Sequence, residues 1–248
     1  MMKRHAGAHE AIPVDGPDAV SPAAPALDFR EVLAAAPAAE RCQSREEERV
    51  NAALHGIGTV AATVAGALLT GHAARTGDFP KLLCAAIFSL SMIGLYAVSA
   101  AYHILPAGPF KDLFQRLDRM TIAVFIAGTY TPVAALLVRG ATGNALLVAE
   151  WALAGLAILF LWGDPERYMR RSEHLYQIMG WGTILGAAPF FRHTPPPVLA
   201  ALALSGTCYG VGVAFLIRDR VKYFHAAFHI LTLLGAALQF WAVSWFLT

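Results

Sequence analysis

Seven apolar stretches, each close to 20 residues long, constrain this chain more than any other feature of its sequence. The hydrocarbon core of a bilayer requires about 20 apolar residues per helix, and clusters of Gly, Pro and charged residues separate the stretches. The composition agrees, because 57% of the residues are hydrophobic, only 15% are charged, and the mean hydropathy is +0.52. We therefore predict an all-α integral membrane protein with seven transmembrane helices. They cover approximately residues 51–71, 81–104, 118–138, 145–163, 175–191, 197–217 and 223–247.

The first 44 residues differ in character from the rest of the chain. They contain few apolar side chains larger than alanine, and five prolines interrupt any helix. We predict a disordered N-terminal tail over residues 1–44 and a transmembrane domain over residues 45–248. Ser44 and Glu47 have the spacing of a capping box, which places a helix start at Arg45. No apolar run follows Lys3 and Arg4, so the first span is expected to act as the insertion signal.

The distribution of positive charge predicts the orientation of the spans. Fifteen of the 19 Lys and Arg residues lie in the tail and in the second, fourth and sixth connections, and four lie on the other side. Because positive residues accumulate in cytoplasmic segments, we predict a cytoplasmic N-terminus and, with seven spans, an external C-terminus. The expected location is a cell membrane, namely the plasma membrane of a bacterium. We expect membrane lipids as partners and no nucleic-acid partner.

Four polar residues share one predicted depth in the bilayer. His225 and His229 begin the last span, and their spacing places both rings on one helix face, about 5–6 Å apart at Cβ. His103 ends the second span and Asp118 begins the third, both on the same predicted side. Ionisable side chains within a membrane are costly unless they have partners, so this convergence indicates a functional site.

Three imidazoles and a carboxylate at one depth are typical of a zinc site. Three neutral imidazoles and a water molecule form an open tetrahedral centre, in which zinc lowers the pKa of the water to about 7. A nearby carboxylate such as Asp118 can hydrogen-bond that water or act as a base. We therefore predict Zn²⁺ bound by His103, His225 and His229, although imidazole also suits copper, iron and nickel. The alternative is a cluster of packed histidines that binds no metal.

The same residues carry a resemblance to a known family. Ser99-x-x-x-His103, Leu117-Asp118, the segment Ala127-Gly128-Thr129-Tyr130-Thr131-Pro132 and His225-x-x-x-His229 resemble, in order, the motifs of the hemolysin III family. That family is the bacterial branch of the progestin and adipoQ receptor superfamily. Glu47 or Glu48, with Asn51, His55 and Gly56, resembles its opening E-x-x-N-x-x-x-H-G element.

The resemblance implies a fold and a set of site residues. It implies seven helices with the N-terminus inside, and zinc held by His103, His225 and His229. It also implies that Asp118 holds a zinc-bound water and that Ser99 lies nearby. The chain departs from the family at Arg119, where members commonly have histidine. Arg119 is expected to pair with Asp118 or to reach lipid headgroups, and either contact would change the base strength of Asp118.

Three functions fit these predictions. Kinship of the superfamily with alkaline ceramidases favours a zinc-dependent hydrolase of amide-linked lipids, with Asp118 and Ser99 as catalytic residues. The second is a receptor-like regulator of membrane lipid state, in which zinc is structural. The third is a cytolytic or pore-forming protein, the role from which the family takes its name. An open coordination position beside a lipid-sized cavity would indicate the hydrolase, whereas a fourth protein ligand would indicate a structural zinc.

Overall fold

The structure is a computed structural model, and it describes residues 43–165, 168, 172–182 and 188–247. The predicted tail therefore lies almost entirely outside the described residues. The described chain is built from helices. In order, these are α2 (Arg45–Arg75), α3 (Phe79–Ile104), α4 (Pro109–Pro132), η1 (Val133–Val138), α5 (Gly140–Gly163), α7 (Ser172–Gln177), η2 (Ile178–Gly182), α9 (Ala188–His193), α10 (Pro196–Leu216) and α11 (Phe224–Leu247).

The prediction of an all-α membrane protein is confirmed, with six described helices long and apolar enough to cross a bilayer. They are α2, α3, α4 continued by η1, α5, α10 and α11, and several extend beyond the predicted stretches. In place of one long fifth span over 175–191, the structure describes the short helices α7, η2 and α9, with residues 183–187 outside the described part. The count of seven spans and the orientation of the termini remain predictions.

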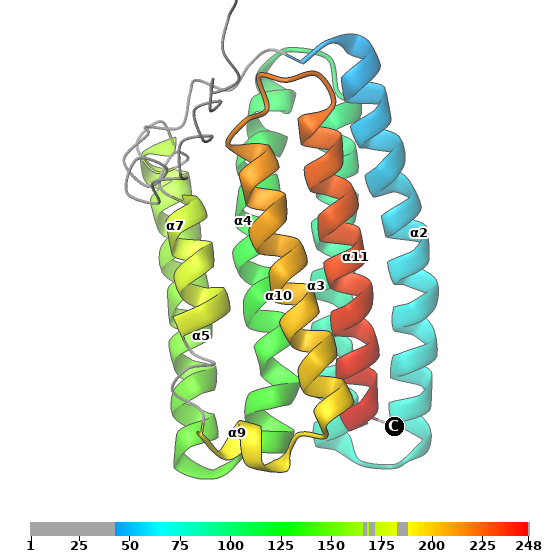
Figure 1. The fold of residues 1–248 in the computed structure, drawn as a ribbon, viewed down its shortest axis with the longest axis vertical. Helices are drawn as coiled ribbons and strands as arrows, with labels where there is room; N and C mark the ends of the chain where they lie inside the picture. The colour runs from blue at the N-terminus through cyan, green and yellow to red at the C-terminus, as the bar shows by residue number, and fades with distance from the viewer. Residues whose placement is uncertain (1–42, 166–167, 169–171, 183–187, 248) are drawn as a thin grey trace, which may run out of the picture. The chain divides into compact units, whose positions relative to one another are not determined.

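The long helices lie side by side, with neighbours in sequence mostly adjacent in space (Figure 1). Helix α3 packs against α2 and α4, α4 packs against α5, and α10 packs against α11. Helix α11 also packs against α2, so the last span returns beside the first. The start of α2, the end of α3 and the start of α11 are thereby brought to one end of the bundle (Figure 1).

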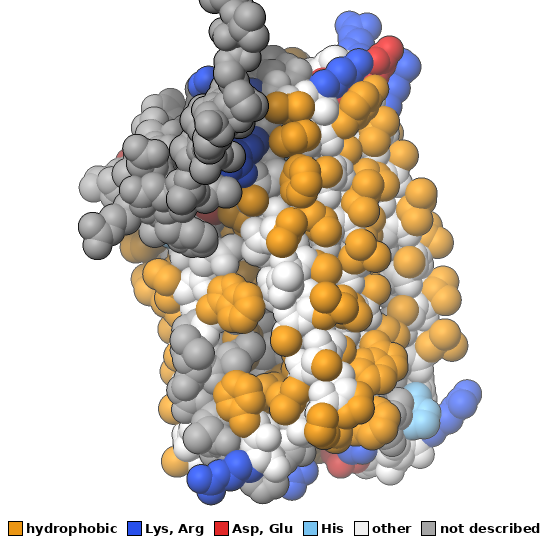
Figure 2. Space-filling model, viewed as in Figure 1, with side chains coloured by type: hydrophobic (Ala, Val, Ile, Leu, Met, Phe, Trp, Pro, Cys, Tyr) orange, Lys and Arg blue, Asp and Glu red, His pale blue; other side chains and the backbone are white. Residues whose placement is uncertain are grey.

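Helix α2 shows how the bundle divides its inner and outer surfaces. Its exposed apolar residues Ile57, Val60, Val64 and Leu68 follow one another at three- to four-residue spacing, which forms one outward stripe. Its buried residues are mostly small or polar. Apolar side chains cover much of the middle of the face shown, and Lys and Arg side chains lie toward its top and bottom (Figure 2). This distribution suits lipid around the middle and water at the ends.

Two local features follow directly from sequence chemistry. The capping box is confirmed, because the Ser44 hydroxyl accepts from the Glu47 N–H while the Ser44 N–H donates to the Glu47 carboxylate. The second feature is in the third predicted span, where helix α4 ends at Pro132 and the chain continues as the π-helix η1. Proline has no N–H to donate, and its ring displaces the carbonyl of the preceding turn, which explains the change of helix type.

Close packing of α5 against η1 depends on Gly143. A Cβ at this position would lie 2.3 Å from the backbone oxygen of Ala134, whereas a Cβ at Gly155 on the same helix meets nothing within 4 Å. We expect Gly143→Ala to destabilise the protein by about 1–3 kcal/mol through overpacking. Gly155→Ala is the matched control, with an expected change within about 0.5 kcal/mol. Thermal unfolding in detergent measures both, and equal stability of the two variants would contradict this packing.

Candidate metal centre

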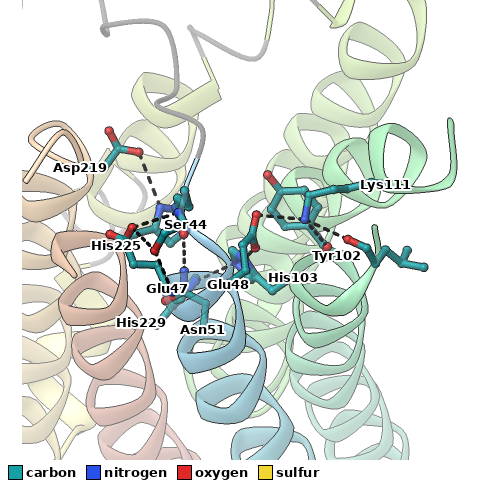
Figure 3. Close-up of polar contacts among 12 residues, drawn as sticks. Ser44, Glu47, Glu48, Asn51, Tyr102, His103, Lys111, Asp219, His225 and His229 are labelled. Atoms are coloured by element: carbon teal, nitrogen blue, oxygen red, sulfur yellow. Dashed lines mark hydrogen bonds and ion pairs between the residues drawn. The ribbon is translucent and has the colours of Figure 1, made fainter. Parts of the chain in front are cut away.

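Three histidines from two helices converge at the end of the bundle where α2 begins (Figure 3). His103 lies in the last turn of α3, and His225 and His229 lie in the first turns of α11. One ring nitrogen from each lies within 4.8 Å of the others, and His229 Nε2 is 3.0 Å from His103 Nε2. The structure therefore brings together the three ligands that the sequence predicts, from segments more than 120 residues apart.

The donor set fits a metal ion. Two nitrogens bound to one tetrahedral zinc at 2.0–2.1 Å lie about 3.4 Å apart, which is close to the observed separation of the Nε2 atoms. His103 and His229 are 3% and 2% exposed, and His225 is partly buried. The Nδ1 atoms of His225 and His229 are buried without a hydrogen-bond partner among the described residues. The cluster thus combines a short contact between two imidazole nitrogens with buried imidazole nitrogens that have no described partner, and a cation shared by the three rings would account for the close approach of their nitrogens.

The first turn of α2 supplies three consecutive glutamates, each with a different partner. Glu46 Oε2 lies 3.3 Å from Lys222 Nζ at the surface. Glu47 Oε1 accepts from the backbone N–H of Tyr223 at 3.0 Å, in addition to its capping role. Glu48 Oε2 lies 2.8 Å from His103 Nδ1 (Figure 3). This turn therefore contacts both helices that carry the histidines.

The contact of Glu47 with Tyr223 stabilises an unusual backbone conformation. Tyr223 has φ +66°, in the left-handed region that costs a non-glycine residue of the order of 1–3 kcal/mol. It immediately precedes α11 and lies two residues before His225. The hydrogen bond to the buried carboxylate of Glu47 holds the chain where α11 begins, and thus helps to set the direction from which His225 and His229 approach.

Asp118 and Ser99 lie beside the histidines rather than within the set of mutually close ligand atoms. Ser99 on α3 is buried, and Asp118 on α4 is partly exposed. Both border one cavity of about 200 Å³, together with His229 and His55. The cavity is lined mainly by residues of α3, α4, α7, η2, α10 and α11, and most of the lining side chains are apolar. These include Leu95, Ile122, Phe125, Ile126, Val133, Leu146, Phe190, Leu202, Val213, Leu216 and Phe228.

Arg119 takes a partner that the sequence did not indicate. Its Nη1 pairs with Glu173 Oε1 on α7, and its backbone carbonyl accepts a hydrogen bond of 2.6 Å from the Tyr176 hydroxyl. The side chains of Arg119 and Glu173 are 12% and 19% exposed, and both residues border the cavity. Arg119 thus joins α4 to α7 through Glu173, where the sequence predicted a contact with Asp118 or with lipid headgroups.

His55 on α2 is a fourth histidine beside this centre. Its ring centroid is 3.9 Å from that of His229 and 6.5 Å from that of His103. Its ring nitrogens do not belong to the group of mutually close ligand atoms found among the described residues, which come from His103, His225 and His229. His55 therefore packs against the ring of His229, beside the three-histidine cluster.

Two neighbours of the histidines could not be assigned from the sequence. The E-x-x-N-x-x-x-H-G spacing fits Glu48 and not Glu47, so this motif could have identified Glu48 as the relevant glutamate. The motif does not, however, show that the Glu48 carboxylate contacts His103. Asp219 precedes α11, and its Oδ2 lies 3.9 Å from His225 Nδ1, beyond hydrogen-bond distance. No spacing rule singles out Asp219, because its proximity depends on the turn between α10 and α11.

Comparison with known proteins agrees with the motifs. The family model described as Haemolysin-III related matches residues 43–240. Hemolysin-3 of Bacillus cereus is 32% identical over 201 residues, covering 81% of this chain and 92% of the relative. The Hemolysin-3 homolog of Bacillus subtilis (strain 168) is 33% identical over 201 residues, covering 81% and 94%. The human monocyte to macrophage differentiation factor is 27% identical over 203 residues, covering 79% and 83%. This chain therefore belongs to the haemolysin-III related family of multi-pass membrane proteins.

Proposed function

We propose that this protein is a zinc-dependent hydrolase that cleaves an amide-linked lipid within the membrane. The observation that carries the proposal is that His229, one member of the three-histidine cluster, borders a mostly apolar cavity. His229, Ser99 and Asp118 border that cavity, so a ligand inside it lies beside the cluster and two further polar side chains. Small-molecule sites commonly combine apolar walls with a few convergent polar groups.

The ligand set supports a catalytic rather than a closed metal site. The mutually close ligand atoms among the described residues come from His103, His225 and His229, and catalytic zinc sites use three protein ligands. The fourth position then remains for water or substrate. A bound zinc ion supplies Lewis acidity, which polarises a carbonyl and makes a water molecule reactive near neutral pH.

The other residues of the site have roles that follow from their chemistry. The Asp118 carboxylate can accept a proton from the attacking water and return it to the leaving amine. The Ser99 hydroxyl can donate a hydrogen bond to the substrate carbonyl oxygen. Apolar side chains such as Ile126, Val133 and Phe228 exclude water and provide a surface for an acyl chain.

Release of fatty acid from lipid amides tests the proposal. Purified protein in detergent is incubated with a ceramide and with an N-acylethanolamine, and free fatty acid is measured by mass spectrometry. We expect release that stops when a chelator removes the metal and returns when zinc is restored. Zinc-loaded, folded protein that releases no fatty acid from any lipid amide would contradict the hydrolase.

A second function is favoured by the origin of the ligands. His103 belongs to α3 and the other two histidines belong to α11, so a metal ion would join two helices. A protein that senses membrane lipid state could use zinc as such a structural link. In that case zinc would raise the thermal unfolding midpoint strongly, as a ligand of the folded state does, while turnover would be absent.

A further inference from the structure

The Glu48 carboxylate lies between a candidate metal ligand and a lysine. Its Oε2 is 2.8 Å from His103 Nδ1, and its Oε1 is 3.0 Å from Lys111 Nζ. The His103 side chain is 1% exposed and that of Glu48 is 21% exposed, so the contact joins a buried imidazole to a partly buried carboxylate. Within this environment a carboxylate contact is stronger and more directional than one at the surface.

The contact determines which ring nitrogen of His103 carries the proton. An ionised carboxylate only accepts hydrogen bonds, so Nδ1 of a neutral His103 must be the donor to Glu48. Nε2 then keeps its lone pair, and Nε2 is the atom that lies 3.0 Å from His229 Nε2. The proton is therefore placed on the side away from the other histidines, as metal binding through Nε2 requires.

Lys111 fixes the carboxylate from its other side. Its ammonium group donates to the backbone oxygens of Tyr102 at 3.0 Å and Leu105 at 3.3 Å, and it lies 4.6 Å from the centre of the Tyr102 ring. Tyr102 and Leu105 flank His103 at the end of α3. Lys111 thus connects Glu48 of α2 to the helix end that carries the histidine (Figure 3).

The neighbouring glutamates provide a natural contrast. Glu46 pairs with Lys222 at the surface, where the two side chains are 71% and 55% exposed, and Glu47 caps α2 and holds Tyr223. Among the hydrogen bonds and ion pairs described for these three glutamates, the contact with an imidazole is the one made by Glu48.

We propose that Glu48, held by Lys111, is a positioning residue that sets the tautomer and ring orientation of His103. The proposal rests on the metal site of the proposed function but not on any catalytic activity.

Zinc affinity of paired variants provides the first test. Full-length Glu48→Gln and Glu46→Gln proteins are purified in detergent, and zinc is titrated against a chromophoric chelator. Loss of a carboxylate behind a metal-bound histidine typically weakens metal affinity by about 10–100-fold, and we expect a loss of this size for Glu48→Gln. Glu46→Gln removes the same charge from the same helical turn and is expected to bind zinc like the wild type.

Nitrogen-15 spectra of histidine in the metal-free protein provide a second readout. We expect the His103 signal, assigned by its loss in His103→Ala, to show a protonated Nδ1 and an unprotonated Nε2. Glu48→Gln should lose this single tautomer, because an amide both donates and accepts hydrogen bonds. If Glu48→Gln fails to fold, Lys111→Met is measured in the same way, and a smaller change in the same direction is expected.

The two readouts separate this proposal from the proposed function. Wild-type protein that binds zinc but hydrolyses nothing would contradict the hydrolase and leave Glu48 as a positioning residue. If the wild type binds no zinc, the spectrum alone still decides whether Glu48 sets the tautomer. Equal zinc affinity in the two glutamine variants, or an unchanged His103 signal in Glu48→Gln, would overturn the proposal.

Discussion

Replacing both His225 and His229 with alanine is expected to remove bound zinc from the purified protein. Wild-type protein should contain about one zinc per chain, because three imidazoles form a complete set of protein ligands for an open site. The double variant retains only His103, and a single imidazole does not hold zinc through purification. Metal analysis after stripping and reloading with zinc measures the stoichiometry and also shows whether copper, iron or nickel binds instead.

The matched control for this experiment is His72→Ala. His72 is exposed in the last turn of α2, at the opposite end of that helix from the histidine cluster, so its removal should leave the zinc content unchanged. A well-folded wild type that binds no metal would refute the zinc site and each mechanism built on it. The three histidines would then be better described as a packed polar cluster or a proton-sensing group.

Replacing Asp118 with asparagine is expected to abolish most hydrolysis while the zinc content stays the same. The amide is nearly the same size as the carboxylate but cannot accept the proton, and loss of a general base typically costs about 10²–10⁴-fold in rate. Asp118 borders the cavity and is not among the three mutually close ligand residues, so we expect metal binding to persist without its carboxylate. Initial rates of fatty-acid release and zinc analysis on the same preparation measure the two effects.

Asp112→Asn is the control for Asp118→Asn. Asp112 lies exposed in the first turn of the same helix, and it does not border the cavity. Its variant should hydrolyse lipid amides at the wild-type rate. Loss of zinc together with activity in Asp118→Asn would show that Asp118 is a metal ligand instead, which would favour the structural role of zinc.

Much of the fold and part of the candidate site could be predicted because the responsible signals are local. The length and apolar character of each stretch decide whether it forms a membrane helix, and these are properties of about 20 consecutive residues. The capping box at Ser44 also depends on neighbours along the chain. The common depth of His103, His225 and His229 could be predicted because helix rise fixes the depth of each residue in the bilayer.

The sequence by itself determined that this is a helical membrane protein and which histidines lie at one depth. Only the tertiary structure decided which carboxylate contacts which partner. Glu47 and Glu48 are adjacent in one turn, yet one contacts Tyr223 and the other His103, because successive side chains point about 100° apart around a helix. Arg119 likewise pairs with Glu173 because α7 packs against α4. Depth follows from position along a helix, whereas the rotation of each helix is set by its packing against the others.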